Sequence, residues 1–150
     1  MHPISVMIKP ASSSCNLQCK YCFYADEASL REIPNYGIMD PQVLEKTVAL
    51  FMGSARGSCS FAFQGGEPTL AGLDFFRQVV ALQEKYARPG LKVTNALQTN
   101  GMVLDEKWCR FLAKHHFLVG LSLDGIKDTH DRYRLCRDGK GSYTSVLRAA

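Results

Sequence analysis

The stretch Cys15-Asn16-Leu17-Gln18-Cys19-Lys20-Tyr21-Cys22 spaces three cysteines as C-x3-C-x2-C. It follows a β-rich run at residues 4–9 and a turn with one proline and three serines at 10–14, so we expect the cysteines in a loop at the end of a strand. Three thiolates in one short loop can hold three irons of a [4Fe-4S] cluster and leave the fourth iron without a protein ligand. That open iron is where chemistry would take place.

The composition indicates one globular unit. The 150 residues are 46% hydrophobic and 21% charged, which supplies enough apolar material for a core. The net charge of +4 is a mild excess, and no run of lysine and arginine is interleaved with aromatic residues as in a nucleic-acid groove. The N-terminus lacks a signal-peptide pattern, and no window holds about 18 consecutive apolar residues. We therefore expect a soluble cytoplasmic protein with no nucleic-acid or membrane partner.

The cysteines divide into the clustered three and the isolated Cys59, Cys109 and Cys136. Clustered thiols without a secretion signal indicate metal ligands in a reducing compartment. We expect the isolated three to be small buried hydrophobic residues. The spacing of Cys19 and Cys22 also fits zinc, but no second C-x2-C or C-x2-H pair supplies the four ligands of a structural zinc site.

A unit of strand, polar loop and helix repeats four times, which predicts a parallel sheet in an α/β fold. Hydrophobic patterns place strands at residues 4–9, 59–64, 91–98 and 117–123, and helices at 41–53, 75–86 and from 106 onward. Asp40 and Asp105 are the expected helix caps. A last helix is expected to start near Ser142.

Finer features also follow from the pattern. The run 59–64 is almost continuously apolar, as in a strand buried on both faces. Val43 is expected on the apolar face of the helix at 41–53. The segment after Tyr24 is polar and predicts irregular structure as far as residue 37.

Unusual residues follow the strands. Gly65-Gly66-Glu67-Pro68 comes after the second strand, and Ser122 and Asp124 alternate on the fourth, which would point both to the same side. Gln64, Gln98 and Asn100 end neighbouring strands, where they face a shared cavity or satisfy loop backbone. Because the carboxyl ends of parallel strands meet, one end of the sheet is expected to be functional. Four units are too few to close a barrel, so we expect an N-terminal portion of a longer protein.

Taken together, the cysteine spacing, the Gly65-Gly66-Glu67-Pro68 turn and Ser122-Leu-Asp124-Gly resemble the radical S-adenosylmethionine (radical SAM) superfamily. Longer blocks are similar to the anaerobic sulfatase-maturating enzymes: Ile8-Lys9-Pro10, Cys22-Phe-Tyr24, residues 63–70, Gln98-Thr99-Asn100-Gly101 and residues 118–125. The resemblance runs through essentially the whole chain. It implies an α/β fold, a partial (β/α) TIM-like barrel of which residues 1–150 form about the first four βα units. The rest of the barrel and an auxiliary-cluster domain would lie beyond Ala150.

The resemblance also implies roles for individual residues. Cys15, Cys19 and Cys22 would ligate the [4Fe-4S] cluster, whose free iron binds S-adenosyl-L-methionine, and Tyr24 would face the substrate. The expected cofactor-binding residues are Tyr21, Gln64, Gly65, Gly66, Glu67, Gln98, Ser122, Asp124 and Arg134. Plainer interpretations stay open, because the glycines and Ser122 to Asp124 also fit ordinary turns. Glu67 is either a hydrogen-bonding partner of the cofactor or a brace for its loop.

Arg134 sits in a charged run, where a planar guanidinium suits the cofactor carboxylate, whereas Arg132 and Arg137 are expected to be solvated.

The implied reaction is oxidation of a cysteine or serine of a sulfatase polypeptide to Cα-formylglycine through a 5′-deoxyadenosyl radical. An electron donor such as flavodoxin or ferredoxin would be the second partner. One alternative keeps the superfamily and changes the substrate to another ribosomal peptide, matured by thioether formation or epimerisation. A non-catalytic zinc-binding α/β module is the alternative from a different class.

Overall fold

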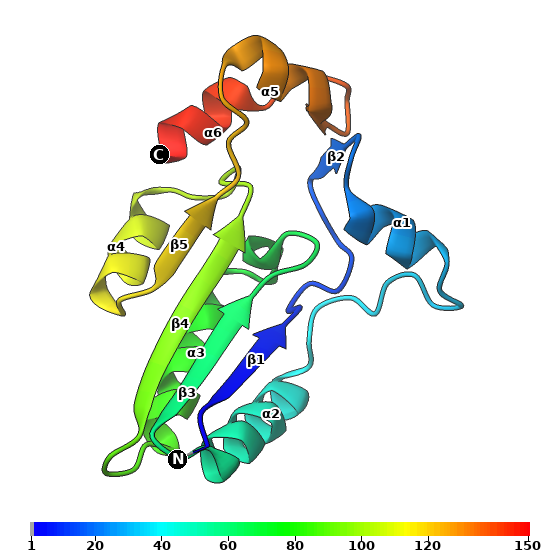
Figure 1. The fold of residues 1–150 in the computed structure, drawn as a ribbon. Coiled ribbons are helices and arrows are strands. Elements are labelled where there is room, and N and C mark those ends of the chain that lie inside the picture. The colour runs from blue at the N-terminus through cyan, green and yellow to red at the C-terminus, as the bar shows by residue number, and fades with distance from the viewer. Residues whose placement is uncertain (1) are drawn as a thin grey trace.

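The computed structural model describes residues 2–150 and contains the expected parallel sheet. Its strands are β1 (Ile4–Ile8), β3 (Ser58–Phe63), β4 (Lys92–Thr99) and β5 (Leu118–Leu121), and they lie side by side in this order. All neighbouring pairs are parallel. The carboxyl ends of the strands therefore meet at one end of the sheet, at the top of Figure 1.

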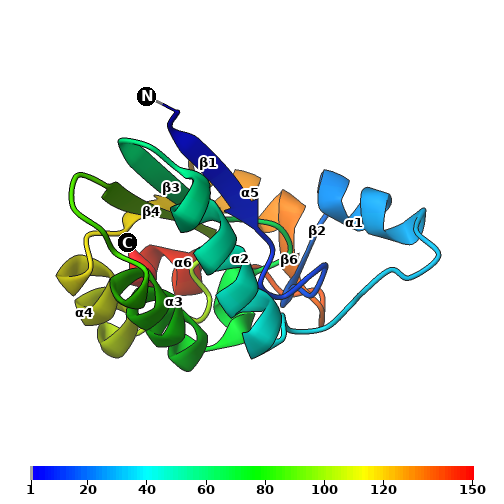
Figure 2. The same cartoon turned by 90° about the horizontal axis from the view of Figure 1, so that it is seen from below.

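Three helices connect the strands and lie along one face of the sheet (Figure 2). These are α2 (Pro41–Ser54), α3 (Leu73–Lys85) and α4 (Glu106–Lys114). Asp40 accepts hydrogen bonds from the amides of Gln42 and Val43, and Asp105 accepts one from the amide of Trp108 at 2.9 Å. Both expected caps are confirmed, because each carboxylate satisfies amides that the first turn leaves free.

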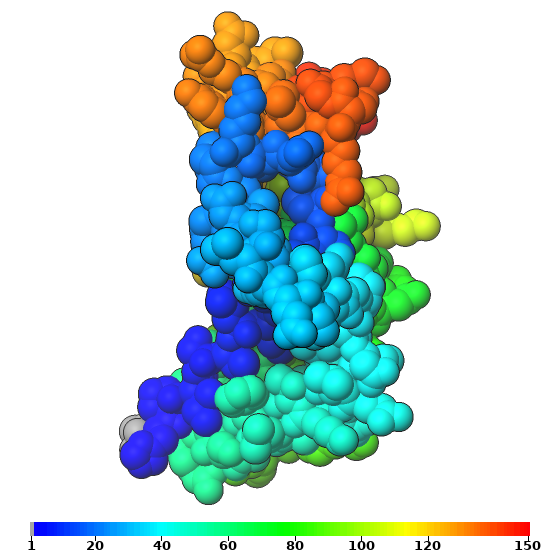
Figure 3. All heavy atoms as spheres, turned by 90° about the vertical axis from the view of Figure 1, so that its right-hand side faces the viewer, coloured from blue at the N-terminus to red at the C-terminus, as the bar shows by residue number. Residues whose placement is uncertain are grey.

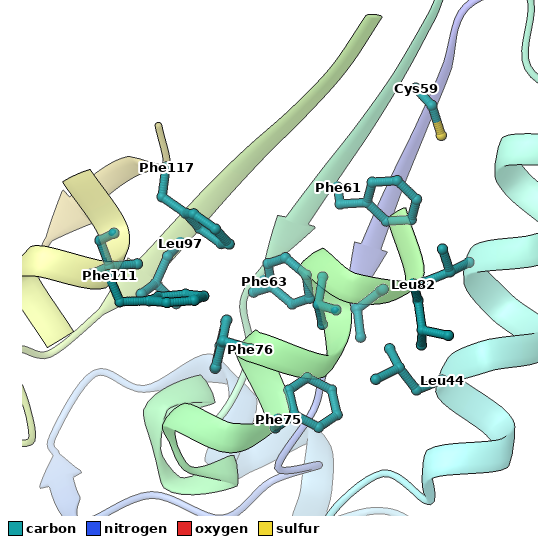
Figure 4. Packing of buried hydrophobic residues seen from close by; sticks show 14 of the residues in the cluster. Leu44, Cys59, Phe61, Phe63, Phe75, Phe76, Leu82, Leu97, Phe111 and Phe117 are labelled. Atoms are coloured by element: carbon teal, nitrogen blue, oxygen red, sulfur yellow. The ribbon is translucent and has the colours of Figure 1, made fainter. Parts of the chain in front are cut away.

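The core fills the space between this sheet face and the helices (Figure 4). Phe76 on α3 lies at its centre, with ring centroids 5.1 Å from Phe63 and 5.2 Å from Trp108 in edge-to-face arrangements. Such geometries are the preferred contacts of aromatic rings. The apolar periodicity of the sequence therefore identified the strands and helices that form this core, although not every buried face.

The expectation that the strand at 59–64 is buried on both faces is wrong. Alternate residues of β3 are buried, namely Cys59, Phe61 and Phe63, while Ser60 and Ala62 are only half-buried. Ser60 accepts a hydrogen bond from Thr94 of β4 on the face that no helix covers. Helices pack on one face only, so the run of apolar letters did not reveal the alternation.

Three other burial predictions also fail. Val43 on α2 is 50% exposed, since the buried face of that helix is formed by Leu44, Val48 and Met52. Of the isolated cysteines, Cys59 is buried as expected, but Cys109 is exposed and Cys136 is half-buried. Each depends on which way a helix or strand faces, and that is set by its packing partner.

Several short elements were not expected from the sequence. The cysteine loop contains β2 (Leu17–Cys19), which pairs antiparallel with β6 (Arg134–Cys136), and α1 (Phe23–Ser29) occupies part of the segment predicted to be irregular. A 3-10 turn, η1 (Pro68–Ala71), follows the glycines, and α5 (Lys127–Tyr133) fills the charged run. The helix expected near Ser142 is α6 (Tyr143–Ala149). Helices and strands this short show too little hydrophobic periodicity to be predicted, and the residues that they contact lie far away in the sequence.

Figure 3 shows α1 and the segment after it covering one side of the molecule, with α5 above them.

The last strand of the parallel sheet, β5, ends at Leu121, two residues earlier than expected. Among residues 2–150, no helix is long and apolar enough to cross a bilayer.

Glu67 connects the loops at the carboxyl end of the sheet. Its carboxylate is almost fully buried. Oε1 accepts hydrogen bonds from the Thr69 amide and hydroxyl and from the Thr99 hydroxyl, and Oε2 accepts one from the Asn100 amide at 2.7 Å. The backbone amide of Glu67 also donates to the Ser14 carbonyl at 2.7 Å. A buried carboxylate is tolerated because four donors satisfy it.

We predict that Glu67→Gln destabilises the fold. The amide retains one acceptor oxygen but turns an NH2 group toward a donor, leaving a buried hydrogen bond broken at a cost of about 1–3 kcal/mol. Urea unfolding of the cluster-free chain measures this loss.

The control for this prediction is Glu84→Gln at an exposed position of α3, which should change the free energy of unfolding by less than about 0.5 kcal/mol. Equal stability of the two variants would contradict the role of Glu67 as a brace.

Candidate functional site

A cavity of about 290 Å³ lies at the carboxyl end of the sheet. All of the predicted site residues line it except Asp124. Phe23 and Thr99 also line it, and they had not been singled out. Thr99 ends β4 beside Gln98, so its place at a strand end was the available signal, whereas Phe23 had none beyond its adjacency to Cys22.

The cysteine loop is held against the glycine turn by backbone contacts. Gly66 has a φ of +58°, a left-handed conformation that favours glycine. A Cβ at this position would collide with the backbone of the loop, and first with the Ser14 carbonyl oxygen. The resemblance implied that Gly66 binds the cofactor. In the structure the missing side chain leaves room for the cysteine loop.

The sulfur of Cys15 lies among N–H donors. The Leu17 amide donates to Sγ at 3.4 Å, and Nδ2 of Asn100 lies 3.7 Å from it while also donating to Asn16. Burial raises the pKa of the Cys15 thiol, and the Leu17 amide opposes this. Backbone and side-chain N–H groups around a thiolate are typical of iron–sulfur ligands, whose reduction potential they set.

Cys19 lies beside Arg134 because β2 and β6 pair these two residues directly. Burial raises the pKa of Cys19, whereas the positive charge of Arg134 lowers it. The antiparallel pair therefore places the guanidinium next to the cysteine loop, although the two residues are far apart in the sequence.

Arg134 Nε lies 3.0 Å from Asp124 Oδ2. The N–H is not aligned on that oxygen, and within residues 2–150 this buried nitrogen has no hydrogen-bond partner. The same guanidinium also lines the cavity, where its planar fork matches the geometry of a carboxylate ligand.

Asp124 is the one predicted residue that does not line the cavity. The expectation that Ser122 and Asp124 share a strand face is wrong, because β5 ends at Leu121 and both residues lie beyond it. Asp124 instead accepts a hydrogen bond from the Tyr21 hydroxyl and pairs with Arg134. It therefore acts behind the cavity wall, by holding two residues that form it.

These contacts shift the pKa values of Tyr21 and Asp124. Burial and the hydrogen bond to Asp124 raise the pKa of Tyr21 to about 12. Burial alone would raise the pKa of Asp124, but the Tyr21 hydroxyl and the Arg134 guanidinium outweigh it and lower the pKa. Asp124 is thus ionised and Tyr21 protonated across the physiological range.

Ser122 does line the cavity, and Gln98 orients it. Nε2 of Gln98 donates to the Ser122 hydroxyl oxygen at 2.9 Å, which leaves the hydroxyl proton available to a ligand. The neighbouring Gly120 has no side chain, and a Cβ there would collide with the Gln98 amide.

Two cationic side chains contact residues that line the cavity. The Lys9 ammonium lies 4.4 Å from the ring centroid of Tyr24, a cation–π contact that fixes the ring at the cavity. Arg137 Nε donates to the Cys15 carbonyl at 3.0 Å. Arg137 is exposed, as expected, but it also contacts the backbone of the cysteine loop.

The cysteines are not arranged as a zinc site. Within residues 2–150, no group of three or more histidine, cysteine, aspartate or glutamate side chains is placed to hold one metal ion. A structural zinc needs four ligands about 2.0–2.3 Å from one point. All three thiols line one cavity, as ligation of an iron–sulfur cluster by three cysteines requires, and the N–H donors at Cys15 agree with that chemistry.

Known proteins resemble the chain throughout its length. A cysteine-type anaerobic sulfatase-maturating enzyme of Clostridium perfringens is 51% identical over 150 residues, covering 100% of this chain and 40% of the relative. A serine-type anaerobic sulfatase-maturating enzyme of Bacteroides thetaiotaomicron is 38% identical over 148 residues, covering 97% of this chain and 35% of the relative. The chain thus spans about 40% or less of the length of these curated relatives.

A solved structure described as native anSMEcpe with bound AdoMet and Cp18Cys peptide superposes with a TM-score of 0.90 at 50% identity. The match covers 98% of this chain and 38% of that one. The sequence model of the Radical SAM superfamily matches residues 10–150, which include every residue of the cavity. The chain therefore belongs to the radical SAM superfamily.

Proposed function

We propose that this chain supplies the cofactor-binding part of an anaerobic sulfatase-maturating enzyme, which oxidises a cysteine or serine of a sulfatase polypeptide to Cα-formylglycine. The observation that carries the proposal is the placement of three cysteines and the Arg134 guanidinium around one cavity. The identity to the cysteine-type relative, 51% against 38% for the serine-type one, favours a cysteine target.

The residues divide the work of binding. Cys15, Cys19 and Cys22 would hold three irons of a [4Fe-4S] cluster, and Arg134 would bind the carboxylate of S-adenosyl-L-methionine. When bound, these cofactors supply one-electron cleavage and a hydrogen-abstracting radical. The chain contributes orientation and a wall against water.

The remaining walls would orient the cofactor and the substrate. Ser122 would present its hydroxyl to the cofactor, held by Gln98. Gln64 and Gly65 line the cavity beside the cysteines, the Tyr21 backbone would meet the adenine, and Tyr24 would contact the peptide. Glu67 is a brace rather than a cofactor ligand, since four donors of the chain already occupy its carboxylate.

The overall oxidation removes two electrons and two protons from a cysteine side chain, and hydrolysis of the thioaldehyde then replaces sulfur by oxygen and releases sulfide. The first electron leaves together with one proton, as a hydrogen atom. The second electron needs an acceptor outside this chain, for which auxiliary clusters like those expected beyond residue 150 are the proposed route.

Residues 1–150 are thus proposed as the N-terminal part of a radical SAM core domain in the cytoplasm. Flavodoxin or ferredoxin is the proposed electron donor.

The decisive experiment uses the complete gene product that carries this sequence, reconstituted anaerobically with iron and sulfide. We expect a cysteine-containing sulfatase peptide to exchange sulfur for oxygen and to lose two hydrogens, as detected by mass spectrometry, and S-adenosyl-L-methionine to be consumed. A matched peptide with alanine at the target position should stay unchanged. Loss of a pair of hydrogens with retention of sulfur would indicate thioether formation instead, and an altered configuration at unchanged mass would indicate epimerisation.

Replacement of Cys19 tests the ligand assignment. We predict that Cys19→Ala loses cluster iron and acid-labile sulfide and no longer cleaves S-adenosyl-L-methionine, because the two remaining thiolates leave two of the four irons without a protein ligand. Iron and sulfide analysis of the reconstituted protein measures the loss.

Cys109→Ala is the matched control, since this cysteine is exposed on α4 and does not line the cavity. Its cluster content should equal that of the unmodified protein. Full cofactor cleavage by Cys19→Ala would refute the assignment.

A further inference from the structure

His130 on α5 is completely buried, with 0% of its surface exposed, and both ring nitrogens are engaged. Nδ1 lies 3.2 Å from the backbone amide of Asp124, and Nε2 lies 2.9 Å from the hydroxyl oxygen of Ser142. The proposed function uses neither His130 nor Ser142. A buried titratable group with two specific partners therefore needs a role of its own.

The hydrogen-bond network defines the tautomer of this ring. An amide can only donate, so Nδ1 accepts the proton of the Asp124 amide. The Ser142 hydroxyl donates its single proton to the Arg134 carbonyl at 2.7 Å. Nε2 must therefore carry the proton and donate to Ser142. His130 is neutral in this arrangement, since a charged imidazole has no acceptor nitrogen.

The two partners of the ring lead to the two members of the ion pair behind the cavity. One nitrogen holds the backbone of Asp124, and the other holds the backbone of Arg134 through Ser142. The side chains of Asp124 and Arg134 then meet at 3.0 Å. Since β5 ends at Leu121, Asp124 has no strand ladder to fix it, and the ring takes over that task.

We propose that neutral His130 is a positioning residue that holds Asp124 and Arg134 in position to form their ion pair. Protonation at Nδ1 breaks this arrangement and weakens binding of the cofactor carboxylate. A protonated Nδ1 would face the Asp124 amide donor to donor. Only the link to the cofactor depends on the proposed function, because the geometry of the ring stands without it.

The charges around the ring set the pH range of the effect. Burial, followed by the positive charge of Arg134, lowers the pKa of His130 from its ordinary 6.5, while Asp124 and Asp131 act in the opposite direction. Two further residues face the ring of His130. They are Ser142, which directly precedes α6, and Tyr143, whose ring centroid lies 5.6 Å from that of His130.

The sign follows from this lowered pKa. His130 contributes its full stabilisation above pH 6.5, where it is neutral in both the folded and unfolded states, and this contribution is lost as the pH falls from 6.5 toward the lower folded-state pKa. The pKa values of Asp124 and Asp131 are lowered from 3.8, so both are ionised where the pH begins to fall below 6.5.

The test measures the affinity of the reconstituted protein for S-adenosyl-L-methionine by equilibrium dialysis on both sides of this window. Wild-type affinity should fall as the pH drops. His130→Phe keeps the ring but loses both hydrogen bonds, so we predict about tenfold weaker binding at alkaline pH, with no further loss on acidification. His130→Asn keeps an acceptor for the Asp124 amide and should bind with intermediate affinity, also without the acid loss.

His116→Asn is the matched control. His116 is exposed, it precedes β5 at the opposite end of the sheet, and its φ of +53° suits asparagine. This variant should keep both the affinity and the pH dependence of the wild type. Iron content should be the same in all variants, because His130 makes no hydrogen bond to a cysteine among the described residues.

Amide hydrogen exchange of Asp124, followed by NMR in the cluster-free protein, gives a readout that does not need the cofactor. The amide should be protected in the wild type, and exposed in His130→Phe or, should that variant not fold, more weakly protected in His130→Asn. Failure of the wild type to bind S-adenosyl-L-methionine would refute the proposed function, and the exchange measurement would still decide the role of the ring. Unchanged protection in the variants, or an acid loss of affinity that persists in them, would overturn the proposal.

Discussion

The buried carboxylate of Glu67 is the interaction on which the carboxyl end of this fold depends. Parallel strands bring their ends together, but the loops that follow them carry backbone groups that no ladder satisfies. One carboxylate accepts from the turn after β3 and from the end of β4, and its own amide binds the cysteine loop after β1. Glu67 thereby joins the three loops that follow β1, β3 and β4.

The cysteine loop gains its shape from both of its neighbours. On one side Gly66 lets the Ser14 backbone approach, and on the other the β2–β6 pair sets Cys19 directly beside Arg134. Asn100, which is held by Glu67 through its amide, reaches Asn16 and the Cys15 sulfur with its side chain. The sulfur atoms, the guanidinium and the Ser122 hydroxyl therefore line one cavity while coming from separate parts of the chain.

Helices cover one face of the sheet, and the other face stays free of them in residues 2–150 (Figure 2). The edge strand β5 exposes 75% of Leu118, and a shallow cavity lies over β3, β4 and β5 on this side.

The resemblance to a known superfamily implied most of the residues that line the cavity. The sequence pattern by itself determined the parallel sheet, the helix caps at Asp40 and Asp105, and the meeting of the strand-end loops at one end of the sheet. These follow from local rules: periodicity identifies strands and helices, and loops after parallel strands meet at one end. Tertiary structure alone decided which face of β3 is buried, the pairing of β2 with β6, and the withdrawal of Asp124 from the cavity wall. It also decided that Glu67 is a brace, and it gave His130 its two partners. Such contacts join residues far apart in the chain, and no local pattern records which donor will meet which acceptor once the core has packed.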